Sequence, residues 1–194
     1  TVVLDSLVPG DTNRVKQSRT DPGGKGVNVA RVLRELQASC LVLGFVAGAL
    51  GRFLEHTLDD LGIAYDFVHV RGQTRTNTTI VDSSHGTKTI ISEPGPETSL
   101  RHLVQVQHKM REYIHPGDWV VMSGSLPPPL EPDTYARLIR LAKELGAFTA
   151  LVPPHLQAEL GYGPLLVGLS FTAFAIFSLL LHYPAGILSD RYGP

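Results

Sequence analysis

Apolar residues along the first 150 positions follow two spacings, one typical of helices and one typical of buried strands. Four stretches place apolar residues at helical spacing with polar residues between them: 27–36, 49–61, 99–114 and 133–145. Four short runs are nearly continuously apolar or β-branched and predict strands: 40–46, 63–70, 118–122 and 148–152. We expect the runs at 40–46 and 118–122 to be buried strands.

A hairpin interrupts this alternation. The segments 76–82 and 87–92 are rich in Thr, Ile and Val, and they flank Ser83-Ser84-His85-Gly86, which has the composition of a turn. The order strand, helix, strand, helix with one inserted hairpin predicts an α/β fold, with a mostly parallel sheet and helices on both of its faces. Binding sites in such folds gather at the carboxyl ends of the strands.

The chain changes character near Leu151–Pro154. From residue 152 to residue 194 the only charged residues are Glu159, Asp190 and Arg191, whereas charges are frequent before it. We therefore predict two parts, 1–151 and 152–194. The formal net charge of -1 gives no electrostatic reason to expect nucleic acid as a partner, and a single cysteine excludes an internal disulfide.

The stretch at 21–28, Asp-Pro-Gly-Gly-Lys-Gly-Val-Asn, precedes the first predicted helix and is the most informative one for chemistry. Gly23 and Gly24 let the backbone approach a ligand closely, and the start of a helix offers free N–H groups. Lys25 adds positive charge, while Asn28 offers a donor and an acceptor. The alternative is a tight turn that caps the helix.

Two further stretches could contribute to the same site. Arg75, at the start of a predicted strand, is suited to bind a phosphate in bidentate fashion. The alternative is a solvated arginine at the edge of a strand. Ser125 follows a predicted buried strand, where a parallel sheet presents ligand-binding groups, although an ordinary strand-to-helix loop also fits. We expect the turns at 23–26, 74–77 and 123–127 to converge in space into one binding site.

These stretches, in this order and with Glu-Pro-Gly-Pro at 93–96, resemble the PfkB-type (ribokinase-like) carbohydrate kinases, and within them the 1-phosphofructokinase and tagatose-6-phosphate kinase branch. The resemblance covers residues 1–151 and implies a partial ribokinase-like fold with a small β-sheet lid. It also implies a cytoplasmic kinase that uses ATP and Mg²⁺ to phosphorylate a sugar phosphate: fructose 1-phosphate, fructose 6-phosphate or tagatose 6-phosphate.

The resemblance assigns roles to individual residues. Gly23, Gly24 and Asn28 would hold sugar hydroxyls, and Arg75 would bind the phosphate already on the sugar, assisted by Arg14. Ser125 would contact the substrate from the strand end. The hairpin around His85 would belong to the lid, through which we expect a homodimer.

The family's catalytic half has no counterpart in this sequence. That half carries a Gly-Ala-Gly-Asp motif, whose Asp is the catalytic base, and no such motif occurs in the 194 residues. Because phosphoryl transfer depends on such positioning and electrostatic groups, we expect no turnover by this chain alone. The sequence assigns it no catalytic residue and no metal ligand. A sugar-phosphate-binding module without catalysis is the alternative function.

The tail has features of a membrane helix. Residues 164–183 are uncharged for about the length that spans a bilayer core, although a buried helix of a soluble core is the alternative. Together with the following residues this stretch resembles a helix and loop of major facilitator superfamily transporters, in which Asp190 and Arg191 would match the gating loop. We therefore expect a hydrophobic C-terminal helix with membrane contact, in a chimeric chain joined near residue 152, and a transporter fragment is a further alternative.

Overall fold

A computed structural model describes residues 1–131 and 133–152 of the chain. The described elements are, in chain order, β1 (Val2–Leu4), β2 (Gln17–Ser18), α1 (Lys25–Glu35), β3 (Leu41–Val46), α2 (Gly48–Asp60), β4 (Ala64–His69), β5 (Asn77–Asp82), β6 (Thr87–Ser92), α3 (Leu100–Tyr113), β7 (Trp119–Ser123), α4 (Thr134–Glu144) and β8 (Phe148–Val152). All the helices and strands predicted before residue 152 are present, with ends within about three residues of the prediction.

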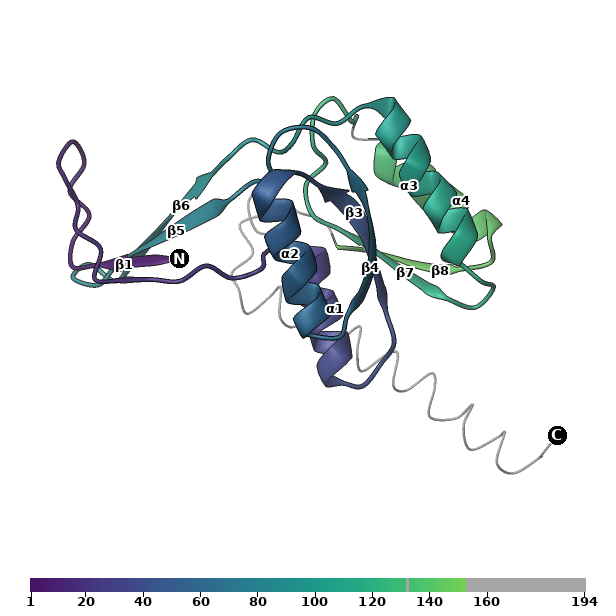
Figure 1. Cartoon of the computed structure of the whole chain (residues 1–194), viewed down its shortest axis with the longest axis horizontal. Coiled ribbons are helices and arrows are strands. Elements are labelled where there is room, and N and C mark those ends of the chain that lie inside the picture. Colours follow the sequence, from purple (N-terminus) through teal and green to yellow (C-terminus); the bar gives the residue numbers. More distant parts are fainter. Residues whose placement is uncertain (132, 153–194) are drawn as a thin grey trace. The chain divides into compact units, whose positions relative to one another are not determined.

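Helices and parallel strands form the larger part, which we call the body: α1 to α4 with β3, β4, β7 and β8. Strands β3 and β4 pair in parallel, and so do β7 and β8. Helices α1 and α2 contact β3, and α3 and α4 contact each other while packing on β4 and β8 (Figure 1). This confirms the predicted α/β fold with parallel strands between helices.

Alternation along the strands explains why helices cover both faces. In β4, Phe67 joins a buried cluster with Leu58 of α2 and Ala30 of α1, whereas the next residue, Val68, joins the opposite cluster. Successive side chains of a strand point to opposite faces, so a strand that is apolar at consecutive positions is covered on both.

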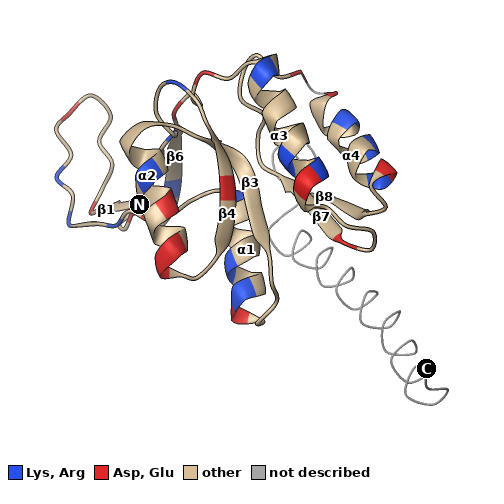
Figure 2. Ribbon diagram, turned by 45° about the vertical axis from the view of Figure 1, so that its right-hand side comes forward, with Lys and Arg blue, Asp and Glu red and all other residues tan. Residues whose placement is uncertain are grey.

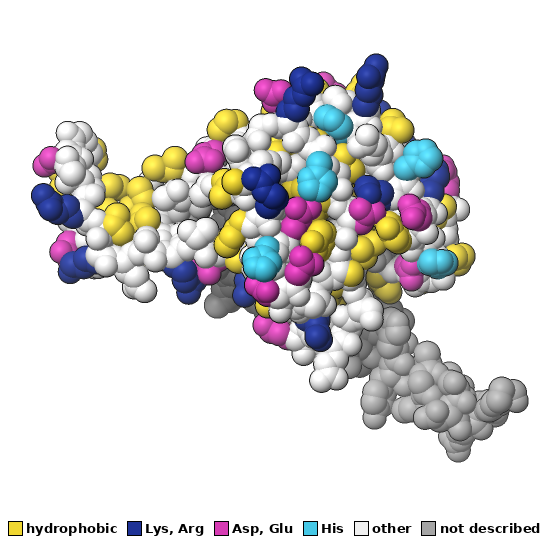
Figure 3. Space-filling view, viewed as in Figure 1, with side chains coloured by type: hydrophobic (Ala, Val, Ile, Leu, Met, Phe, Trp, Pro, Cys, Tyr) yellow, Lys and Arg dark blue, Asp and Glu magenta, His cyan; other side chains and the backbone are white. Residues whose placement is uncertain are grey.

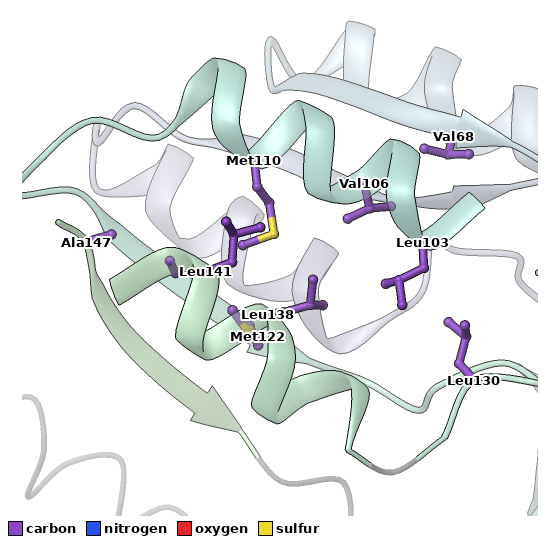
Figure 4. Close-up of a cluster of buried hydrophobic side chains, with 10 residues drawn as sticks. Val68, Leu103, Val106, Met110, Met122, Leu130, Leu138, Leu141 and Ala147 are labelled. Carbon is purple, nitrogen blue, oxygen red and sulfur yellow. The ribbon is translucent and has the colours of Figure 1, made fainter. Parts of the chain in front are cut away.

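The larger cluster lies between α3, α4 and the strands. Its members come from β4, β7, α3, α4 and the loops beside them: Val68, Leu103, Val106, Met110, Met122, Leu130, Leu138, Leu141, Ala142 and Ala147. Figure 4 shows Met110 of α3 and Leu141 of α4 pointing toward each other within this cluster. An ion pair beside this cluster also links α3 to β4, because Lys109 Nζ lies 2.5 Å from Asp66 Oδ1 and the Tyr113 hydroxyl donates to Asp66 Oδ2 at 3.1 Å. The hydrogen bond from Lys109 holds the pKa of Asp66 below its ordinary value.

The remaining strands form a four-stranded sheet in the order β2-β1-β5-β6, which we call the lid sheet. The hairpin β5–β6 is antiparallel, as predicted, with Thr79 opposite Ile90. Strand β1 pairs in parallel with β5 and antiparallel with β2. Strands β1 and β2 were not predicted, because strands of three and two residues are too short for a periodic pattern to be recognised.

The predicted burial of strand 118–122 is wrong on one face. Trp119 is 49 % exposed, Val121 40 % and Phe148 56 %, and the rings of Trp119 and Phe148 stack with their centroids 5.1 Å apart. Trp119 pairs with Phe148, so these residues lie on one face of the β7–β8 pair, opposite the face that bears Met122. Among the described residues this face has little cover, which is why its apolar side chains remain exposed.

The predicted boundary near 151–154 coincides with the end of the described residues and stays a prediction. The C-terminal helix at 164–183 and the transporter-like Asp190 and Arg191 lie outside the described residues. Within 1–131 and 133–152, none of the helices has the length and apolar character needed to cross a bilayer.

On the outward faces of α1 to α4, Lys and Arg are interspersed with Asp and Glu (Figure 2).

Candidate functional site

Arg75 and Ser125 are neighbours although they are fifty positions apart in the sequence. The Arg75 Nη2 atom lies 3.4 Å from Ser125 Oγ, to which it donates, and both side chains are exposed. Arg75 lies in the connection from β4 to β5, and Ser125 lies in the loop that follows β7. The structure thus places a guanidinium and a hydroxyl side by side, where both could donate to one anion.

The loop that carries Arg75 is fixed on both sides of this residue. On one side, Thr74 donates its backbone N–H to Ala47 O at 3.0 Å and accepts the Ala47 N–H on its hydroxyl at 2.9 Å. On the other side, the Thr76 N–H donates to Glu93 Oε2 at 2.9 Å. Ala47 directly follows β3 in the body, whereas Glu93 directly follows β6 of the lid sheet, so Arg75 sits where the two parts meet.

The loop that carries Ser125 is fixed by a helix. The Tyr135 hydroxyl of α4 lies 3.1 Å from Ser123 O and 2.9 Å from Gly124 O, so this hydroxyl is placed to donate to both carbonyls. Burial raises the pKa of Tyr135, which keeps the hydroxyl protonated as a donor. Gly124 has a φ of 98°, which favours glycine and turns the chain sharply at the end of β7.

The glycine-rich turn directly precedes α1. Gly24 is the N-cap residue and has a φ of 109°, so a side chain at this position would strain the backbone. A Cβ added at Gly23 or Gly26 would meet nothing within 4 Å, so packing among the described residues does not explain why side chains are absent there. Open backbone in front of the first free N–H groups of a helix is the geometry that suits close approach of a ligand.

The remaining predicted residues lie outside these two loops. Lys25 and Asn28 belong to the first turn of α1, which packs against β3 and β7, and both are exposed. Arg14 is exposed in the loop between β1 and β2 of the lid sheet. Among the described candidates, the structure therefore joins Arg75 to Ser125 directly, and the participation of Lys25, Asn28 and Arg14 stays a prediction.

Sequence reasoning missed the residues that hold the two loops. Glu93 was visible as part of the Glu-Pro-Gly-Pro motif, but its position gave no indication that its carboxylate accepts from Thr76. Thr98 donates from its hydroxyl to Pro128 O at 2.6 Å in the Ser125 loop, and Tyr135 holds the same loop from α4. Of these three residues only Glu93 belongs to a motif that the sequence shows. Thr98 precedes α3 and Tyr135 lies in α4, and neither position indicates a contact with the Ser125 loop.

A second polar cluster lies in the lid sheet. Asp82 is 5 % exposed, and it accepts from the backbone N–H of Leu7 at 2.9 Å and from the N–H of His85 at 3.0 Å. The Leu7 N–H and, after it, the His85 backbone and ring lower the pKa of Asp82 to about 2. Asp82 thus ties the β1 end to the β5–β6 turn, so its contacts are those of a structural residue.

Within 1–131 and 133–152, His, Cys, Asp and Glu side chains do not come together in a group of three or more that could hold a metal ion. The chemistry of Arg75 and Ser125 is of another kind. What they can do is donate hydrogen bonds and positive charge to an anion.

Many known proteins are similar to this chain, among them one curated relative and two solved structures. A tagatose-6-phosphate kinase of Staphylococcus epidermidis is 38% identical over 148 residues, which cover 76% of this chain and 47% of that protein. The crystal structure of the phosphofructokinase-2 from Escherichia coli in complex with fructose-6-phosphate matches with a TM-score of 0.72 and 26% identity, covering 82% of this chain and 53% of that one. The structure of a possible 1-phosphofructokinase from Thermotoga maritima matches with a TM-score of 0.66 and 32% identity, covering 84% and 53%.

The sequence profile of the pfkB family carbohydrate kinase matches residues 2–171, which is most of the chain and extends beyond residue 152. The chain spans about half the length of the curated relatives that it matches. The transporter resemblance of the tail has no counterpart among these findings. Because the family match extends over residues 2–171, the chain belongs to the pfkB family of carbohydrate kinases.

Proposed function

We propose that this chain is the substrate-binding half of a sugar-phosphate kinase, and that Arg75 and Ser125 bind the phosphate already present on the sugar. The observation that carries this proposal is the 3.4 Å contact between Arg75 Nη2 and Ser125 Oγ. Two donors from separate loops, beside a sharply turned backbone at Gly124, offer an anion several hydrogen bonds at once.

Gly23, Gly24 and Asn28 would then contact the sugar itself. The open space at Gly23 supports this role, because bare backbone there can approach hydroxyl groups. The positive charges of Lys25 and Arg14 would add attraction for the anionic substrate. The similarity to a tagatose-6-phosphate kinase favours tagatose 6-phosphate, with fructose 6-phosphate and fructose 1-phosphate as the other candidates.

Calorimetric titration of the chain with these three sugar phosphates tests the proposal. Arg75→Ala is expected to weaken binding about 10-fold to 100-fold, because a charge-assisted bidentate contact is lost. Arg71→Ala, which removes another exposed arginine of the same connection, is the matched control and is expected to bind as the original chain does. Equal affinities of the two variants would contradict the proposal.

The whole kinase would use ATP and Mg²⁺ in the cytoplasm, as family membership suggests, and the residues for this step would come from a second half. A coupled ATP assay on this chain alone is therefore expected to detect no turnover, although calorimetry is expected to detect binding of the sugar phosphate. Turnover by these 194 residues would contradict the division of labour between the two halves. A non-catalytic sugar-phosphate-binding module is the second candidate, because the contact between Arg75 and Ser125 could bind a phosphate without any nucleotide.

We also propose that the lid sheet joins two copies of the chain. All six residues of β6 are exposed, including Ile90 at 65 % and Ile91 at 54 %, and β6 is the outer strand of its sheet. An exposed apolar edge strand is suited to pair with a second copy. Figure 3 shows hydrophobic side chains at the surface over the lid sheet. In light scattering, I90S/I91S is expected to lower the dimer fraction, whereas T87S/T89S is expected to leave it unchanged.

A further inference from the structure

One short segment of the chain touches both loops of the candidate site. Residues 93–99 connect β6 of the lid sheet to α3 of the body. We propose that Glu93 and Thr98 in this segment are positioning residues, which set the separation between Arg75 and Ser125. The inference rests on the proposed binding of a sugar phosphate at that pair.

Glu93 acts on the Arg75 side. Its carboxylate Oε2 accepts the N–H of Thr76 at 2.9 Å, and its own N–H donates to Thr76 O at 3.3 Å. Both main-chain polar groups of the residue next to Arg75 are therefore bound to one residue. The contact from Thr74 to Ala47 fixes the other neighbour, so Arg75 can change position only if one of these two attachments opens.

Thr98 acts on the Ser125 side. Its hydroxyl lies 2.6 Å from Pro128 O and 3.5 Å from Pro127 O, in the loop that begins with Gly124 and Ser125. Proline lacks a backbone N–H, so these two residues cannot themselves donate a main-chain hydrogen bond that would hold the loop. Within the loop, the Leu130 N–H donates to Pro127 O at 3.0 Å, and the Thr98 hydroxyl adds the contact that ties Pro128 O to the segment 93–99.

The segment between Glu93 and Thr98 is itself held against both loops. The Glu97 N–H donates to Arg71 O at 3.0 Å, which fixes it to the start of the connection that carries Arg75. On its other side, a Cβ added at Gly95 would lie 3.4 Å from Pro127 Cβ, so the backbone passes directly along the Ser125 loop. The segment therefore fits between the two loops and determines their spacing.

This arrangement has a consequence for affinity. Arg75 and Ser125 are both exposed, and neither is held by burial, so the geometry of their donors depends on the hydrogen bonds of the loops that carry them. Donors that are prepositioned bind an anion more tightly than donors that must be ordered on binding. Loss of Thr98 or Glu93 contacts should therefore weaken phosphate binding without removing any group that touches the ligand.

Calorimetric titration with tagatose 6-phosphate tests the inference through two pairs of variants. Thr98→Val removes the hydroxyl at nearly constant shape and is expected to weaken binding about fivefold, and Thr98→Ser is expected to restore it. Glu93→Ala is expected to weaken binding by a similar factor, whereas Glu93→Gln keeps an acceptor oxygen and is expected to restore most of it. In an Arg75→Ala background, Glu93→Ala is expected to have no further effect, because the donor that Glu93 positions is gone.

The outcomes separate this inference from the proposed function. Unchanged affinity in Thr98→Val and Glu93→Ala, with weakened binding in Arg75→Ala, would overturn the inference and leave the proposed function intact. The same fivefold loss in the Arg75→Ala background would show a general structural effect and would also overturn it. If the original chain binds none of the three sugar phosphates, the proposed function fails.

A measurement without ligand then decides the inference by itself. Nuclear magnetic resonance of the labelled chain is expected to show faster amide hydrogen exchange at Thr76 in Glu93→Ala. In Thr98→Val it is expected to show a displaced Ser125 amide resonance. Unchanged exchange and an unchanged resonance would overturn the inference.

Discussion

The body and the lid sheet differ in how much of each is covered. In the body, β3 and β4 have helices on both faces. The Leu58 side chain of α2, which packs with residues of these strands, is 0 % exposed. In the lid sheet, every residue of β6 is exposed, and Ile90 reaches 65 %. The body is therefore stabilised by buried apolar area, whereas the lid sheet relies more on backbone pairing and on a few polar contacts. The candidate site lies where these two parts join, which makes its geometry sensitive to both.

The largest expected effect is a cavity in the body. Leu58→Ala is expected to lower the free energy of unfolding by about 2–5 kcal/mol, because a fully buried side chain is lost and its surroundings collapse only in part. The matched change in the lid sheet, Ile90→Ala, is expected to lower it by less than about 0.5 kcal/mol. Urea unfolding at a fixed, low protein concentration measures both. Similar losses for the two variants would contradict the contrast between body and lid sheet.

The next effect concerns the junction itself. Thr74→Val is expected to lower the free energy of unfolding by about 1–3 kcal/mol, because the buried N–H of Ala47 loses its acceptor. Ala47 is 2 % exposed, so water cannot readily replace the hydroxyl. Thr74→Ser keeps the acceptor and serves as the control in the same urea experiment. A loss as large in Thr74→Ser would show that packing of the methyl group, and not the hydrogen bond, is responsible.

The fold was largely predictable, but the site was predictable only in part. The strands at 41–46 and 64–69 were predictable because a strand covered on both faces is apolar at consecutive positions, and the helix between them was predictable from apolar residues at helical spacing. Arg75 and Ser125 were predicted from residue type and position, and the structure brings them together. Thr98 and Tyr135 were not, because a single hydrogen bond to a distant loop leaves no local pattern. The exposed face of Trp119 was missed for a related reason, since an apolar run does not say whether both of its faces are covered.

A third effect depends on pH and tests the lid sheet. The pKa of Asp82 is about 2 in the folded chain, below the value of about 3.9 for an unfolded aspartate. Its stabilisation is therefore fully present above about pH 5 and is lost as the pH falls toward 2. We expect Asp82→Asn to be less stable than the original chain at pH 7, with a difference that shrinks steadily during acidification.

Urea unfolding at a series of pH values measures this difference. Asp60→Asn removes an exposed carboxylate of α2 and serves as the control. It is expected to change the free energy of unfolding less than Asp82→Asn does at pH 7, because its side chain is 69 % exposed. A gap between Asp82→Asn and the original chain that stays constant from pH 7 to pH 2 would show that Asp82 acts by shape and not by charge.

The smallest expected effect lies back in the body, at the ion pair between Lys109 and Asp66. The two side chains are 23 % and 30 % exposed, and their atoms approach to 2.5 Å, so the pair is partly screened by water. Lys109→Met is expected to lower the free energy of unfolding by about 0.5 kcal/mol at low ionic strength, as partly exposed ion pairs typically do. In 1 M NaCl the loss should become smaller, because salt screens the attraction in the original chain.

Asp66 also accepts a hydrogen bond from the uncharged Tyr113 hydroxyl, so Tyr113→Phe removes this hydrogen bond and leaves the ion pair in place. The effect of Tyr113→Phe on the free energy of unfolding should not depend on salt. If the loss in Lys109→Met is also independent of salt, then the packing of the aliphatic part of Lys109 matters more than its charge.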